Sequence, residues 1–130
     1  LIGKTHAELG SSHYAGLRGD SGGNVPQPVP NALDCLRATH NALRFVRACH
    51  DCSEGGIGVA LAEMCLAGRL GAAIQLDSIT AESLRADEIL FSESLCRFIV
   101  EVAPEHEDAF RAALGDVSFT RIGSVMLATS

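Results

Sequence analysis

The segment that most constrains the fold is an apolar helix that begins at two glycines, Gly55 and Gly56. Ser53 or Asp51 is placed to cap it, and we expect the helix to span about residues 56–68. Because a helix that is apolar or small on two faces packs on more than one side, the chain must surround it with other layers. One face is apolar and its neighbour is made largely of small residues: Ile57, Leu61, Met64 and Cys65 on the first, Ala60, Glu63 and Ala67 on the second.

Periodic patterns elsewhere alternate between helix and strand. Helical spacing is expected over about residues 32–47, with Asn31 as the cap, and again from Pro104 to Gly115. Several strands follow one another without long crossovers, which favours an α+β fold with a mixed or largely antiparallel sheet packed against helices. The predicted strands lie at about 72–76, 97–102 and 117–125, and a weakly patterned connection, part of it helical, lies at 79–88.

The helix expected at 32–47 has one apolar face and one basic face. We expect the apolar face to lie on the core and the basic face to lie in solvent. The apolar positions are Leu33, Leu36, His40, Leu43 and Val46, and the basic ones are Arg37, Arg44 and Arg47.

The length of 130 residues predicts one domain, residues 1–130. The chain begins without Met, and Leu1-Ile2-Gly3 resembles the end of a strand, so we expect a domain excised from a longer protein. The net charge is −6, and the chain has no Lys/Arg cluster, no Trp and a single Tyr. This composition argues against nucleic acid as a partner. The apolar run from Ile57 to Ala62 is also far too short to span a membrane.

The start of the chain lacks the apolar region of a secretory signal. The number of cysteines, five, is odd, and Cys35, Cys65 and Cys96 lie in apolar patterns. Both observations favour a cytoplasmic protein whose thiols are reduced and buried as small apolar groups.

The stretch Cys49-His50-Asp51-Cys52 allows two interpretations. A Cys-x-x-Cys pair can bind metal or act in redox chemistry, but a structural zinc site needs four ligands and the chain offers no second pair. A redox pair also opens its helix directly, whereas here the glycines intervene. Incidental thiols are the simpler interpretation, and we predict no metal site.

The same stretch continues as Ser53-Glu54-Gly55-Gly56 and then enters the helix. Glycines permit close backbone approach, and the first amides of a helix favour an anion such as phosphate or carboxylate. A plain helix cap remains the alternative, because many helices begin in this way.

A second polar stretch, Ser92-Glu93-Ser94, precedes the strand that begins at Arg97. Arg97 is placed either to pair with Glu93 or to bind an anion in bidentate fashion. The alternative is a turn with a surface salt bridge, which contributes little stability.

Four stretches of the chain resemble one enzyme family in the order in which that family has them. They are "LIGKTHAELGSSHY" (1–14), "HDCSEGGIGVALAEM" (50–64), "LFSESLCRFIVEV" (90–102) and "TRIGSV" (120–125). They resemble segments of phosphoribosylformylglycinamidine synthases, in the C-terminal domain of the aminoimidazole-ribonucleotide-synthetase-like superfamily. The four together cover nearly the whole chain.

The resemblance implies a ligase of purine biosynthesis that converts formylglycinamide ribonucleotide to formylglycinamidine ribonucleotide with ATP, Mg and ammonia. It implies as partners an N-terminal ATP-binding domain that carries the Mg-binding acids, a glutaminase and a small accessory subunit. This C-terminal domain would contribute phosphate-, nucleotide- or substrate-facing loops and would be inactive alone. The expected binding residues are Asp51, Ser53, Glu54, Gly55, Gly56, Ser92, Glu93 and Arg97, and no catalytic residue is expected.

Two alternatives stay open. The first is another member of the superfamily: selenophosphate synthetase, thiamine-phosphate kinase or the hydrogenase-maturation dehydratase. The second is a purely structural domain that packs against a partner and binds no ligand of its own. Fold resemblance does not separate these, because function resides in sites.

Overall fold

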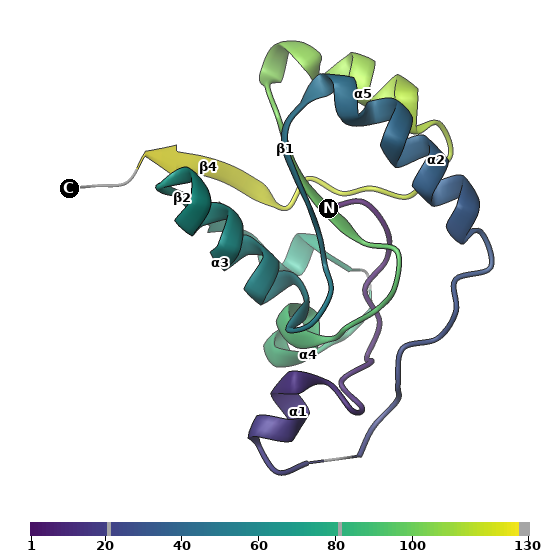
Figure 1. The fold of residues 1–130 in the computed structure, drawn as a ribbon, viewed down its shortest axis with the longest axis vertical. Helices are drawn as coiled ribbons and strands as arrows, with labels where there is room; N and C mark the ends of the chain where they lie inside the picture. Colours follow the sequence, from purple (N-terminus) through teal and green to yellow (C-terminus); the bar gives the residue numbers. More distant parts are fainter. Residues whose placement is uncertain (21, 81, 128–130) are drawn as a thin grey trace.

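The computed structural model describes residues 1–20, 22–80 and 82–127, and it has helices and strands interleaved along the chain (Figure 1). The α-helices are α1 (His13–Leu17), α2 (Ala32–Ala42), α3 (Gly56–Gly68), α4 (Ala86–Phe91) and α5 (Glu107–Leu114). The strands are β1 (Val46–Asp51), β2 (Leu70–Ile74), β3 (Phe98–Val102) and β4 (Gly123–Leu127). Short 3-10 helices occupy Leu43–Phe45, Leu76–Ser78 and Pro104–His106.

The four strands form two antiparallel pairs. β1 pairs with β3, with Asp51 opposite Phe98, and β2 pairs with β4, with Ile74 opposite Gly123. Ile2 adds isolated bridges to Phe98 and Phe119, so the first residues of the chain lie beside β3. The predicted α+β class with antiparallel pairing is confirmed.

The core has two parts. One surrounds α3 and includes Ile57, Ala60, Ile89 and Ile99. The other lies between α2 and α5, which run side by side in Figure 1. Its buried members are Ile2, Cys35, Ala42, Phe110 and Leu114.

Helix α3 has the predicted bounds, but its cap differs from the prediction. The cap residue is Gly55, with φ 76°, and no side chain caps the helix. The Ser53 hydroxyl instead donates a hydrogen bond to the Asp51 carboxylate. The prediction that Ser53 or Asp51 caps α3 is therefore wrong, because these two side chains bond to each other.

Helix α2 is shorter than predicted and presents a different face to the core. It ends at Ala42, and the strand β1 begins at Val46. The buried residues are the small ones, Cys35, Thr39 and Ala42, while the leucines predicted for the core are exposed. Small side chains allow α2 to lie close to α5, which explains the change of face.

Other segments depart from the predictions more modestly. The last strand starts at Gly123 rather than 117, and the strand predicted at 72–76 is β2, Leu70–Ile74. The five-residue α1 was not predicted. Pro104 begins a 3-10 turn that leads into α5, and Gly115 follows α5 as predicted.

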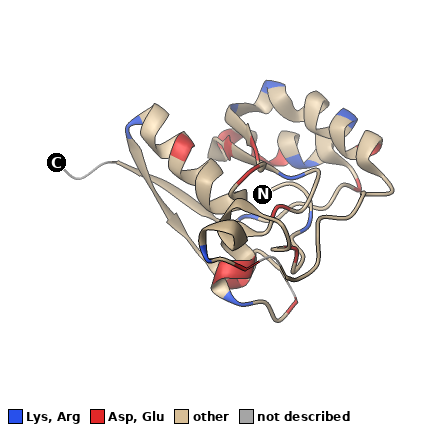
Figure 2. Ribbon diagram, turned by 60° about the horizontal axis from the view of Figure 1, so that its bottom comes forward, with Lys and Arg blue, Asp and Glu red and all other residues tan. Residues whose placement is uncertain are grey.

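Charged residues are spread over the whole ribbon (Figure 2). In the described part of the chain, no helix is long and apolar enough to cross a membrane.

Candidate functional site

The antiparallel pairing of β1 and β3 brings the two polar stretches together. The Cys52 amide donates to the Arg97 carbonyl at 2.9 Å, immediately beyond the strand pair. The loop 51–56 therefore runs beside the loop 92–97, although the two are about forty residues apart in the sequence. The sequence predicted both as anion-facing loops, and the structure places them at one end of the β1–β3 pair.

The Glu93 carboxylate lies at the start of α3. Its Oε1 accepts hydrogen bonds from the Gly55 amide at 2.9 Å and from the His13 amide at 3.1 Å. The start of a helix carries partial positive charge and unpaired amides, so a carboxylate there is stabilising. The chain thus supplies its own anion to two helices, α3 and α1.

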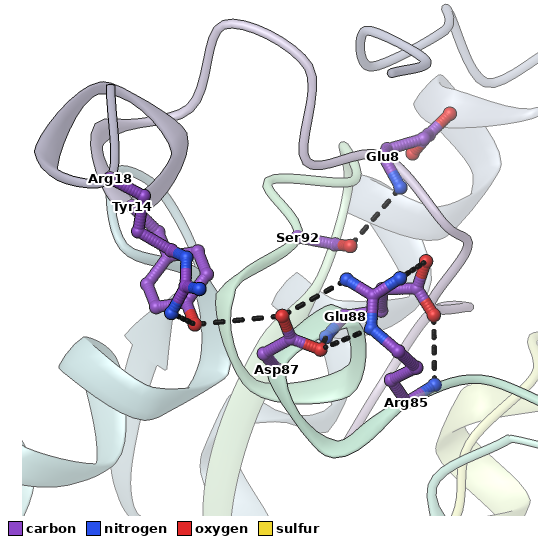
Figure 3. A network of polar contacts seen from close by, with 7 residues as sticks. All are labelled: Glu8, Tyr14, Arg18, Arg85, Asp87, Glu88 and Ser92. Atoms are coloured by element: carbon purple, nitrogen blue, oxygen red, sulfur yellow. Dashed lines mark hydrogen bonds and ion pairs between the residues drawn. The ribbon is translucent and has the colours of Figure 1, made fainter. Parts of the chain in front are cut away.

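The N-terminal segment closes over the loop 92–94. The Glu8 amide donates to Ser92 Oγ and the His6 amide donates to Ser94 Oγ, each at 3.1 Å. Ser92 and Ser94 are both buried. Figure 3 shows the Glu8–Ser92 contact beside the polar residues of α4. These bonds join the segments at 1–14 and 90–102.

Arg97 is buried and holds the loop 92–94 from the interior of the domain. Its side chain is 1% exposed, its Nε donates to the Ser94 carbonyl at 2.8 Å and its NH1 donates to Thr5 Oγ1 at 3.0 Å. A further hydrogen bond goes from NH2 to the Ser92 carbonyl. Burial lowers the pKa of Arg97 from its usual value. The predicted pairing with Glu93 is not formed, because the Arg97 donors bond instead to two backbone carbonyls and Thr5. Arg97 is thus an internal support for the Ser92–Ser94 loop.

Position 56 requires glycine because the backbone of residues 90–92 lies so close to it. Its φ is 60°, and a Cβ atom placed on it would lie 2.4 Å from the Ser92 carbonyl oxygen. No side chain fits there without displacing backbone, so the two loops touch through a glycine.

The outer edge of the loop is exposed. Asp51, Ser53 and Glu54 are all exposed, and the Ser53 hydroxyl bond lowers the pKa of the Asp51 carboxyl. The Gly56 amide bonds to the Ser53 carbonyl, whereas the Ser53 and Glu54 amides form no hydrogen bond within the described ranges. Among the described residues, the Ile57 and Gly58 amides in the first turn of α3 likewise have no acceptor, so the start of α3 offers four amides to an anion: those of Ser53, Glu54, Ile57 and Gly58.

The thiols and imidazole of this region carry no metal cluster. Cys49 is exposed and Cys52 is buried, and burial raises the pKa of Cys52 to about 11. His50 Nε2 lies 2.9 Å from Glu63 of α3, and its Nδ1 contacts the Asp51 carbonyl. Residues 1–20, 22–80 and 82–127 contain no group of three His, Cys, Asp or Glu side chains that could hold a metal ion.

Helices α1 and α4 are joined through aromatic and charged contacts. Tyr14 stacks on Phe91 with ring centroids 4.6 Å apart, and its hydroxyl reaches Asp87 at 3.5 Å. Arg85 holds Asp87 through two bonds of 3.0 Å (Figure 3). This pairing fixes α1 and hence the His13 amide that binds Glu93.

The sequence did not identify Thr5, Glu8, Ser94 and His13 as members of this region. All four act through a backbone amide or a buried hydroxyl, which no side-chain pattern indicates. The resemblance of residues 1–14 to one family segment was the signal available, because it pointed to the segment without giving roles to its residues.

The chain matches the family described as AIR synthase related protein, C-terminal domain, over residues 4–126. Among its curated relatives, it is 38% identical over 120 residues to phosphoribosylformylglycinamidine synthase subunit PurL of Trichormus variabilis, covering 88% of this chain. It is 43% identical over 112 residues to the same subunit of Moorella thermoacetica, covering 83% of this chain. In both cases the chain spans 15% of the relative's length.

Two solved structures have the same fold. PurL of Thermotoga maritima complexed with FGAR matches with a TM-score of 0.77 at 24% identity, covering 97% of this chain and 23% of that one. The same protein complexed with ATP matches with a TM-score of 0.60 at 28% identity, covering 73% and 17%. By the match over residues 4–126, this chain belongs to the family of AIR synthase related proteins and is its C-terminal domain.

Proposed function

We propose that this chain is the C-terminal domain of a phosphoribosylformylglycinamidine synthase. The whole enzyme would convert formylglycinamide ribonucleotide, ATP and ammonia into formylglycinamidine ribonucleotide, a step of purine biosynthesis. The observation that carries this proposal is the convergence of three family-like segments, residues 1–14, 50–64 and 90–102, on the end of the β1–β3 pair. The identity of 38–43% to two PurL subunits supports the same assignment.

Within the enzyme, the proposed ligand-facing segment is the exposed edge Asp51, Ser53 and Glu54. The amides of Ser53 and Glu54 would donate to phosphate or substrate oxygens, which is electrostatic rather than covalent catalysis. Gly56 allows the loop to approach the Ser92 carbonyl closely, and Gly55 makes room for the Val59 side chain of α3. The remaining proposed residues shape this edge from behind: Ser92, Glu93 and Arg97.

The proposal includes ATP and Mg, which would be bound by a neighbouring domain of the same enzyme. An N-terminal ATP-binding domain would carry the Mg-binding acids, and a glutaminase with a small accessory subunit would deliver ammonia. The PurL structure complexed with ATP supports the use of ATP. We further propose that the enzyme acts in the cytoplasm.

The chain by itself is proposed to be inactive. The Ser53 hydroxyl donates to the Asp51 carboxylate, but the lowered pKa of Asp51 makes this carboxylate a weak base. His50 contacts Glu63 and the Asp51 carbonyl, which is the environment of a structural histidine. The domain would position ligands whose reacting atoms are held by its neighbour.

The test is turnover by the full synthetase polypeptide that contains this domain. We expect ATP- and ammonia-dependent formation of formylglycinamidine ribonucleotide, and no product with the 130-residue chain alone. Turnover of selenide in place of formylglycinamide ribonucleotide would instead assign the chain to the selenophosphate synthetases. Activity that persists after deletion of this domain would favour the structural alternative.

A further inference from the structure

The exposed face of α2 and of the 3-10 turn after it carries large apolar side chains. Leu33, Leu36 and Leu43 are 57%, 47% and 40% exposed, although the residues that α2 buries are small. Leucines are normally the residues that a helix buries, so a helix that buries Cys35 and exposes Leu36 is unusual for a solvent-facing surface.

The spacing of these side chains is that of helix pairing. Residues 33, 36, 40 and 43 follow one another at intervals of three, four and three, which places them on a single stripe. This is the a/d spacing at which two helices interlock. The stripe covers about three helical turns, or roughly 15 Å.

The surface also contains a hollow that suits a facing helix. A shallow cavity of about 400 Å³ is lined by four residues of α2, namely Leu36, Arg37, His40 and Asn41. The depression lies beside Leu36 and is open to solvent. Because the leucine stripe has a/d spacing, the occupant is expected to be helical rather than extended.

The charges around the stripe indicate the sign of the charge that the occupant should carry. Residues 31–47 hold three arginines, Arg37, Arg44 and Arg47, and one acid, Asp34, in a chain whose net charge is −6. Arg47 is engaged by Glu101 and Glu105, each at 3.7 Å. Arg37 and Arg44 are exposed and lie beside the leucines, so the flank of the stripe is basic.

A second copy of this chain fits the stripe poorly. With residues 33, 36, 40 and 43 at positions a, d, a and d, Arg37 and Arg44 both take position e. An antiparallel α2 pair would therefore bring arginines of the two copies together, and a parallel pair would leave each arginine opposite an uncharged residue at position g. Like charges beside an apolar seam disfavour pairing. A helix with leucines on one face and acids on its flanks would pack against the leucines of the stripe and pair with its arginines.

We propose that the α2 stripe, residues Leu33, Leu36, His40 and Leu43 flanked by Arg37 and Arg44, is a docking surface for an acidic amphipathic helix of a partner protein. The stripe is exposed beside the face of α2 that packs on α5, and it does not include the Ser53 loop. The proposal is independent of the reaction that the enzyme catalyses.

The test uses synthetic 21-residue helices as probes and the full polypeptide that contains this domain as the receptor. The acidic probe has Leu at positions a and d and Glu at e and g, and the basic probe has Lys in place of Glu. We expect the acidic probe to bind and the basic probe to bind more weakly, with the difference reduced by salt. Fluorescence anisotropy gives both affinities.

Three variants localise the binding. Leu36→Gln should weaken binding of the acidic probe about tenfold, because a leucine no longer becomes buried. Leu17→Gln makes the same change at an 89% exposed leucine of α1 and should have no effect. Arg37→Glu should weaken the acidic probe about two- to fivefold and strengthen the basic one.

Absence of binding, equal affinity for the two probes, or insensitivity to Leu36→Gln would overturn the proposal. Light scattering of the protein without probe tests the remaining candidate occupant, a second copy of this chain. A concentration-dependent dimer that Leu36→Gln abolishes would also overturn it, in favour of a second copy of this chain.

Discussion

Glu93 Oε1 accepts a hydrogen bond from the Gly55 amide at 2.9 Å, so a side chain of the chain itself lies where the sequence led us to expect a ligand anion. The same oxygen accepts from the His13 amide at 3.1 Å. One carboxylate thereby ties the loop 92–94 to the first residues of α3 and α1. The ligand-facing role is left to the outer edge at Asp51, Ser53 and Glu54.

Glu93→Ala should destabilise the domain by about 1–2 kcal/mol, because two helix-terminal amides lose their acceptor. Glu93→Gln keeps an acceptor oxygen and should cost less. Urea unfolding measures both. Glu54→Ala, at an exposed position 3.5 Å from His13, should change stability by less than about 0.5 kcal/mol. Equal effects at Glu93 and Glu54 would show that the Glu93 bonds do not stabilise the domain.

Arg97→Lys should destabilise the domain by about 3 kcal/mol or more. Lysine cannot reproduce the planar set of donors, so the Ser92 and Ser94 carbonyls and Thr5 lose partners in the interior. Arg37→Lys at the exposed face of α2 is the matched control and should be nearly neutral. The comparison uses equilibrium unfolding in urea, and near-equal midpoints for the two variants would contradict a supporting role for Arg97.

Gly56→Ala should cost about 3 kcal/mol or more, whereas Gly19→Ala should cost about 1 kcal/mol. Both glycines have positive φ, 60° and 69°, so both variants incur backbone strain. Gly19 has open space around it, but a Cβ on Gly56 would collide with the Ser92 carbonyl. Differential scanning calorimetry measures the difference. Similar costs would mean that the loops at 51–56 and 92–97 are not in tight contact.

Cys49 should react with iodoacetamide at pH 8 long before Cys52. Only the thiolate reacts, and burial raises the pKa of Cys52 to about 11, so its thiolate fraction at pH 8 is on the order of one in a thousand. Cys49 is exposed, although burial of part of its side chain and the nearby Asp51 raise its pKa as well. Peptide mass spectrometry after timed quenching gives the order. Equal rates, or a Cys49–Cys52 disulfide formed by mild oxidation, would revive the redox interpretation.

The sequence predicted α3 because three signals agree at it: two glycines, an apolar stripe and a small-residue face. The structure confirms its bounds, Gly56–Gly68. The pattern at 32–47 was ambiguous, because both the leucine face and the face of Cys35, Thr39 and Ala42 can pack. Packing against α5 selects the face of Cys35, Thr39 and Ala42, and the local pattern of residues 32–47 carries no information about α5.

The site was predicted as segments rather than as contacts. Sequence reasoning placed Ser53–Gly56 and the residues Ser92, Glu93 and Arg97 among the binding candidates, and the structure brings the two segments together. It did not indicate that Glu93 would turn toward Gly55 or that Arg97 would be buried. Both outcomes depend on the N-terminal segment, whose Thr5 and Glu8 contact the loop through a buried hydroxyl and a backbone amide.

The most direct measurement is kcat/KM for formylglycinamide ribonucleotide in the full synthetase polypeptide, for the wild type and two double variants. Asp51→Asn with Ser53→Ala changes the exposed loop edge, and Asp116→Asn with Ser118→Ala changes an Asp-x-Ser of the same spacing elsewhere on the surface. We expect the wild type to turn over, the first variant to lose at least about tenfold, equivalent to roughly 1.4 kcal/mol of transition-state stabilisation, and the second to match the wild type. Equal kcat/KM in all three proteins, or a wild type that does not convert this substrate, would contradict the proposed site and function.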